Sequence, residues 1–113
     1  MTRLKNNNPD EAQTALVEAL QLAKQYGSLS LMLMGLTIYG FWLRAVGELS
    51  QAMAIVTQVQ LYPNHYYMRM TEEKANILHR LLVDELDAAA VHEAEELGRS
   101  LILDDLIDEI VGG

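Results

Sequence analysis

Apolar residues recur every three or four positions through the first stretch of the chain, residues 9–26. This spacing places them on one face of an α-helix, with the polar positions on the other face. Pro9 suits the first turn of such a helix, and Gly27 suits the left-handed residue that commonly follows one. The pattern therefore predicts a helix from Pro9 to Tyr26.

Two further helices follow, each with a clear end. The second is predicted over residues 29–46, because Gly47 provides a stop signal directly after it. The third is predicted over residues 49–61 and ends before Pro63, which cannot continue a helix. The two helices would form a hairpin, since the connection between them is short.

The second of these helices contains an uncharged run from Leu29 to Leu43. A membrane-spanning helix needs about 20 apolar residues to cross roughly 30 Å of hydrocarbon. This run has 15 residues, and they include Ser30 and Thr37. The run is therefore predicted to be a helix enclosed by neighbouring helices, with no membrane span.

The second half of the chain contains three more amphipathic stretches. Thr71 suits a helix N-cap, and an apolar stripe follows it. A further helix is predicted to start at Asp84 or Asp87 and to end at Gly98 as its C-cap. The residues of these two buried faces are Ala75, Leu78, Leu81 and Leu82, then Leu86, Ala90, Val91, Ala94 and Leu97. A short helix from Leu103 to Val111 completes an all-α protein of five or six helices.

The helices of the first half also repeat. Ala12 and Ala19 are seven residues apart, as are Ala52 and Val59, and the two pairs lie 40 residues apart. A period of about 40 residues is typical of stacked helix pairs. We therefore expect helix-pair repeats over 9–63 and separate closing helices over 64–113. Residues 1–8 are expected to be disordered or to derive from an expression vector.

The finer spacing of small residues resembles that of a tetratricopeptide (TPR) repeat. Gly40, Gly47 and Ala52 match its small residue, its turn glycine and the small residue of its second helix. Leu36 and Leu43 match its first large apolar position and its aromatic position. The resemblance implies TPR-like antiparallel hairpins stacked into an α–α superhelix, with Gly40 facing Ala52 across a hairpin.

The end of the chain has a resemblance of its own. The segment "EKANILHRLLVDELDAAAVHEAEELGRSLILDDLIDEIV" is similar to the C-terminal end of large bacterial regulators that carry TPR arrays. These include LuxR-type and activator-domain transcriptional regulators and related cyclases and kinases. The matching residues are Gly98-Arg99 and Leu103-Asp104-Asp105. The resemblance implies closing helices of a solenoid within a C-terminal fragment of a larger regulator.

Charge and composition narrow the classes of function. The net charge is −8, and residues 84–113 hold ten of the sixteen acidic residues and only one base, Arg99. Such a surface repels phosphate, so we expect no direct nucleic-acid binding by this segment. Cysteine is absent, which excludes disulfides and thiolate chemistry and fits a cytoplasmic location. No secretory signal pattern opens the chain.

Catalysis finds little support in the residue pattern. His92 and Glu96 are spaced to share a helix face, but two ligands do not make a metal site. The acids near the end of the chain lack the spacing of a calcium loop. No glycine-rich phosphate loop or nucleophile motif is present. We therefore expect no enzyme activity, no cofactor and no metal.

The candidate site is a protein-interaction surface on the helix at 29–46. By the TPR resemblance, its concave side would carry Met34, Thr37, Phe41 and Arg44, a strip suited to a peptide. The alternative, which the spacing favours, is that these residues only pack on a preceding repeat or on C-terminal helices folded back over them. Met34, Ile38, Phe41 and Trp42 are the expected contact of a homodimer.

Together, these expectations predict a role in protein interaction. The chain is predicted to be a non-catalytic interaction or regulatory module of a larger bacterial regulator, or alternatively a stand-alone peptide-binding adaptor. Its expected partners are a protein or peptide, other domains of the parent chain, or a second copy. The segment 8–26 resembles the second helix of a repeat without its first helix, which suggests a fragment.

Overall fold

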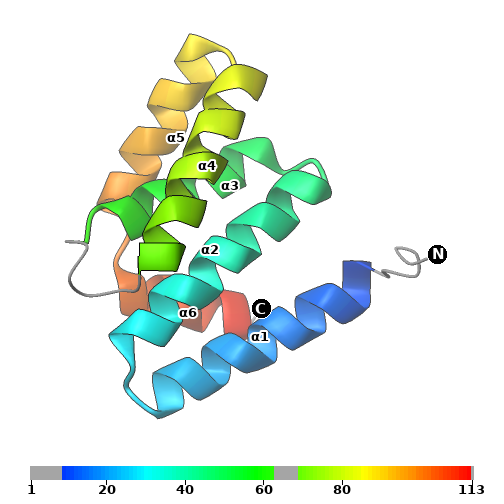
Figure 1. The fold of residues 1–113 in the computed structure, drawn as a ribbon, viewed down its shortest axis with the longest axis vertical. Helices are drawn as coiled ribbons and strands as arrows, with labels where there is room; N and C mark the ends of the chain where they lie inside the picture. Colours follow the sequence, from blue (N-terminus) through cyan, green and yellow to red (C-terminus); the bar gives the residue numbers. More distant parts are fainter. Residues whose placement is uncertain (1–8, 63–68, 113) are drawn as a thin grey trace.

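The computed structural model describes residues 9–62 and 69–112 as α-helices and short connections (Figure 1). Six helices and no strand occur in these residues, which confirms the prediction of an all-α protein. The helices are α1 (Pro9–Gln25), α2 (Leu29–Ala45), α3 (Leu49–Gln60), α4 (Arg69–Glu85), α5 (Ala88–Ser100) and α6 (Leu103–Gly112). The expectations for residues 1–8 and for the stop at Pro63 lie outside the described residues.

Two left-handed glycines form the first turns. Gly27 has φ +66° between α1 and α2, and Gly47 has φ +90° between α2 and α3. Residues with a side chain rarely adopt this backbone conformation, so glycine is favoured there. Ser28 then caps α2 by accepting a hydrogen bond of 3.2 Å from the backbone N–H of Leu31. These signals placed the ends of α1, α2 and α3 within one residue of the prediction.

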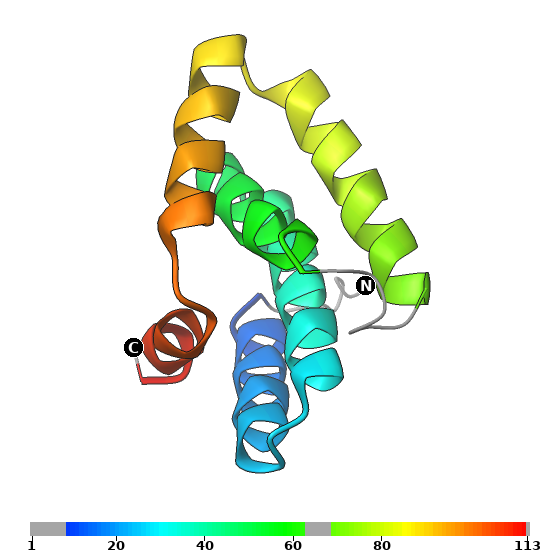
Figure 2. The same ribbon diagram turned by 90° about the vertical axis from the view of Figure 1, so that its left-hand side faces the viewer.

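The centre of the molecule is α3. All eight residues from Ala52 to Val59 are buried, including the polar side chains of Thr57 and Gln58. Figure 2 shows why: α4 and α5 diverge from the turn that joins them, and α3 lies between them and against α2. The most apolar helix, α2, was expected to be the enclosed one. It instead keeps one face exposed, because hydrophobicity alone does not show how many neighbours a helix has.

Helices α3 and α5 approach each other closely at Gly98 in α5. A Cβ placed there would lie 2.5 Å from the backbone oxygen of Ala54 and 2.7 Å from the Cβ of Thr57. The prediction that Gly98 is a C-cap is therefore wrong, since α5 continues to Ser100 and Gly98 does not have a positive φ. Its lack of a side chain lets α3 and α5 touch.

A buried side chain completes the end of α5. With its amide nitrogen turned toward the helix end, Gln58 donates to the carbonyl oxygens of Gly98 at 2.8 Å and of Leu101 at 3.1 Å. Carbonyl groups in the last turn of a helix have no partner within the helix. Locally, the Leu101 N–H donates to the Gly98 carbonyl and the Ser100 hydroxyl donates to the Leu97 carbonyl. Gln58 adds donors from α3, so a neighbouring helix contributes to the end of α5.

The starts of α4 and α5 differ in how well the sequence predicted them. α4 begins at Arg69, so Thr71 lies inside the helix, 2% exposed, and the N-cap prediction for it is wrong. Asp87 caps α5 by accepting a hydrogen bond of 2.8 Å from the N–H of Ala90, whereas Asp84 lies within α4. Leu97 was expected to be buried and is 54% exposed.

Gly40 lies where three helices meet. A Cβ there would be 2.8 Å from Leu78 Cδ2 in α4, 3.7 Å from Ile55 Cγ2 and 3.9 Å from the Ala52 oxygen in α3. Gly40 therefore does lie near Ala52, as expected. Its nearest neighbour, however, comes from α4, which the repeat spacing did not suggest.

The last helix packs against the first. α6 lies beside α1 in both views, with Leu103, Leu106 and Ile107 buried (Figures 1 and 2). Lys24 of α1 forms an ion pair with Asp108 of α6. The two ends of the described chain are thus joined across the fold.

Candidate interaction surface

One face of α2 is apolar and is only partly covered by the residues that the structure describes. We call it the α2 stripe and define it by five residues at helical spacing: Leu31, Met34, Ile38, Trp42 and Ala45. Leu31 is 41% and Ile38 43% exposed, Ala45 is exposed, and Met34 and Trp42 are half-buried. Helices α1, α3 and α4 pack on other sides of α2. The stripe carries no charge along its whole length.

The six residues predicted for a partner surface do not lie on one face. Met34, Ile38 and Trp42 belong to the α2 stripe, and Phe41 is half-buried against the core. Thr37 is 1% exposed, and its hydroxyl donates to the Leu33 carbonyl at 2.9 Å. A buried, locally bonded Thr37 does not contribute to a contact surface.

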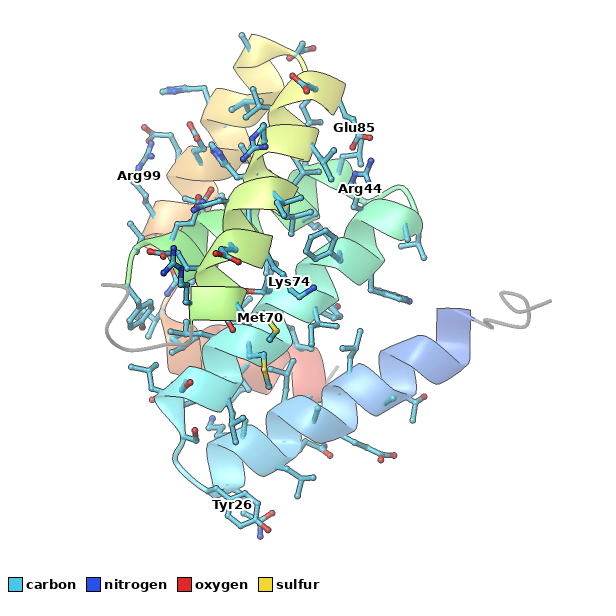
Figure 3. The ribbon with its side chains drawn as sticks, in the orientation of Figure 1. Tyr26, Arg44, Met70, Lys74, Glu85 and Arg99 are labelled. Atoms are coloured by element: carbon cyan, nitrogen blue, oxygen red, sulfur yellow. The ribbon has the colours of Figure 1, made fainter. Side chains whose placement is uncertain are left out.

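The remaining predicted residue, Arg44, faces α4. Its Nε donates to Glu85 Oε1 at 2.8 Å and its Nη2 to Oε2 at 2.6 Å. Figure 3 shows the two side chains next to each other. Gly40, one turn earlier, also contacts α4 through Leu78. Around Gly40 and Arg44, α2 is therefore covered by a C-terminal helix folded back over it.

The Arg44–Glu85 pair has a defined electrostatic effect. The hydrogen bonds from Arg44 lower the pKa of Glu85 below its ordinary value of 4.5, since they stabilise the ionised carboxylate. The hydrogen bond to Glu85 likewise raises the pKa of Arg44. The pair stays ionised at neutral pH and lies on the side of α2 that faces α4.

Aromatic stacking stiffens the middle of the stripe. The rings of Tyr39 and Trp42 lie 5.6 Å apart between centroids, with an angle of 19° between their planes. Stacking at this distance favours one orientation of the indole. Burial raises the pKa of the Tyr39 hydroxyl, which therefore stays protonated at neutral pH. Trp42 is thus a positioned, partly exposed aromatic residue of the kind common in contact surfaces.

Other reactive side chains are scattered. His92 Nε2 lies 3.8 Å from Glu96 on exposed α5, and His79 Nε2 lies 3.2 Å from Glu95 Oε2 between α4 and α5. In the described part of the chain, no three His, Asp or Glu side chains gather closely enough to hold a metal ion. No helix within residues 9–62 and 69–112 is long and apolar enough to cross a membrane.

Leu31 and Ala45 belong to the stripe but were missed from sequence. Their signal was present, because they continue the spacing of Met34, Ile38 and Trp42 by one turn at each end. The TPR resemblance instead indicated the neighbouring side of the helix, with Thr37, Phe41 and Arg44. The helices that pack on α2 determine which of its residues stay exposed, and helical spacing alone does not show where those helices lie.

Neither a family model nor a curated protein nor a solved structure matches this chain.

Proposed function

We propose that the chain is a non-catalytic protein-interaction module whose TPR-like helix hairpins present the α2 stripe to a partner helix. The observation that carries this proposal is an exposed, uncharged helix face on a chain of net charge −8. Contiguous apolar surface of this kind usually marks a contact site. A polar, solvated face would be the ordinary arrangement at an exposed helix.

The dimensions of the stripe define its partner. Leu31 to Ala45 spans 14 helical steps, or roughly 21 Å at 1.5 Å a residue. An amphipathic helix of about four turns has an apolar face of this length. Because the stripe offers no charge to pair with, we expect the partner's contact face to be uncharged as well.

A second copy of the chain meets these requirements. Two stripes related by a two-fold axis are self-complementary, since each presents the same apolar residues to the other. The acidic side chains of α6 lie on a different part of the fold, beside α1, so like charges need not meet. In a larger cytoplasmic regulator, a helix of another domain would take the same place; in a stand-alone adaptor, a peptide would.

Sedimentation equilibrium across a micromolar concentration range tests the proposal. We expect the apparent mass of the wild-type chain to rise with concentration toward that of a dimer. Ile38→Asp places a charge at the centre of the stripe and should leave a monomer. Ile77→Asp is the matched control, because Ile77 is 46% exposed in the middle of another helix, α4.

Two results would contradict the proposal. A wild-type chain that stays monomeric at every concentration would show that the stripe does not take a second copy. Equal loss of association in Ile38→Asp and Ile77→Asp would place the contact elsewhere. Far-UV circular dichroism of both variants checks that each remains helical.

A further inference from the structure

An open pocket of about 480 Å³ lies between α2, α3, α5 and α6, apart from the α2 stripe. Figure 2 shows the end of α5 and the turn into α6 beside α3. The apolar wall includes Leu43 of α2, Ile55 of α3 and Leu106 of α6, with Leu97 at 54% exposure. Pockets of roughly 300–1,000 Å³ with mostly apolar walls are the usual size for small-molecule ligands.

Three polar side chains also line this pocket. They are Tyr39, whose hydroxyl can donate or accept, the amide of Gln51, and the carboxylate of Glu109. Among the described residues, no basic side chain lines the pocket. The full charge that this described lining carries is therefore negative, and it belongs to Glu109.

We infer that this pocket binds a small amphiphile that has an apolar aryl or alkyl body and one ammonium head. The body would contact the leucine and isoleucine wall, where burial of apolar surface favours binding. The head would donate a charge-assisted hydrogen bond to Glu109. An anionic amphiphile of the same shape would meet the Glu109 carboxylate without a compensating cation.

The chain contains its own reporter for this site. Tyr39 lines the pocket and stacks on Trp42, with ring centroids 5.6 Å apart. Trp42 is the only tryptophan in the sequence. A ligand that contacts Tyr39 should therefore change the fluorescence of a single indole, and calorimetry can confirm the affinity independently.

Three probes with one body separate the contribution of the head. They are 4-phenylbutylamine, 4-phenylbutanol and 4-phenylbutanoate, titrated into the full chain at pH 7. We expect saturable binding of the amine, about five- to tenfold weaker binding of the alcohol, and no measurable binding of the carboxylate. In Glu109→Gln the amine should bind only as tightly as the alcohol.

Asp105→Asn is the matched control for Glu109→Gln. Both changes remove one negative charge from α6, but only Glu109 lines the pocket. We expect Asp105→Asn to keep the preference for the amine. Ile38→Asp should also keep it, because Ile38 is not a lining residue, so this test stands or fails apart from the proposed contact at the α2 stripe.

The inference is overturned if the folded wild-type chain gives no saturable response to the amine. It is equally overturned if the amine and the carboxylate bind alike, or if Glu109→Gln leaves the affinity for the amine unchanged. Circular dichroism of Glu109→Gln should match the wild type, because the side chain is exposed and its replacement has the same shape.

Discussion

Glycines within helices report how closely the neighbouring helix approaches. Gly35, Gly40 and Gly98 all have a neighbouring atom within 3 Å of where a Cβ would lie. At Gly35 and Gly40 that atom is the end of a leucine side chain, which has some freedom to move. At Gly98 it is the backbone oxygen of Ala54, which cannot move without shifting α3. Gly98 is therefore the least replaceable of the three.

We expect Gly98→Ala to lower the free energy of unfolding by about 1–3 kcal/mol through overpacking between α3 and α5. This is the net loss that we expect after the gain of roughly 1 kcal/mol that alanine normally brings to a helix interior. Gly112→Ala, with no neighbouring atom within 4 Å of its added methyl group, should change stability by less than about 0.5 kcal/mol. Urea denaturation measures both, and equal midpoints for the two variants would refute the close contact.

The sequence predicts some roles of single residues and misses others. Gly27 and Gly47 follow apolar helices and precede new ones, so their turn role is visible in the local pattern. Gly98 has a similar local context, followed by Arg99 and Ser100, and was misread as a cap. Its actual role depends on Ala54, 44 positions earlier in the chain, and no local pattern carries that information.

At the scale of elements, the reliability of the predicted helix ends follows the type of signal. Gly27 and Gly47 form the turns between α1, α2 and α3, and the predicted ends of these helices lie within one residue of the observed ends. The predicted start of α4 was wrong. Thr71 is a residue type that often caps helices, but it lies within α4 and its side chain is buried. The choice between Asp84 and Asp87 was open in the sequence and is resolved by the hydrogen bond to Ala90.

The two aspartates differ in their expected effect on stability. Asp87→Ala removes the N-cap of α5 and should lower the free energy of unfolding by about 1 kcal/mol. Asp84→Ala removes an acid from the last turn of α4, where negative charge opposes the helix dipole, and should leave stability unchanged or slightly higher. Both variants lose one charge, so thermal denaturation compares them directly. A larger loss in Asp84→Ala would contradict the assignment of the cap.

At the scale of the whole molecule, the sequence predicted helix faces but not their partners. The apolar side of the last helix was identified from its spacing, yet nothing in that spacing selects α1 as its neighbour. In the same way, the uncharged run of α2 predicted enclosure, while α3 became the enclosed helix. The six predicted surface residues consequently lie only partly on the exposed side of α2.

Among the described residues, two ion pairs connect the N-terminal helices to the C-terminal ones. Lys24 of α1 pairs with Asp108 of α6, and Arg44 of α2 pairs with Glu85 of α4. The second pair joins residues 41 positions apart with two parallel hydrogen bonds, a geometry that favours a persistent contact. Arg69 and Glu73, by contrast, pair within α4 and hold no two helices together.

The Arg44–Glu85 pair should make stability depend on pH in a defined direction. Because the folded-state pKa of Glu85 is lowered, the unfolded chain takes up the proton first as the pH falls. The stabilisation is therefore complete above about pH 4.5, the ordinary pKa, and is lost as the pH drops through the lower folded-state value. Glu85→Gln abolishes this stabilisation at every pH.

The difference in urea midpoint between the wild type and Glu85→Gln should be largest near neutral pH and should close in acid. Glu73→Gln should show a smaller difference, because the partner of Glu73 lies on the same helix. A gap for Glu85→Gln that stayed constant from neutral pH to pH 3 would mean that the pair does not fasten α2 to α4 in solution.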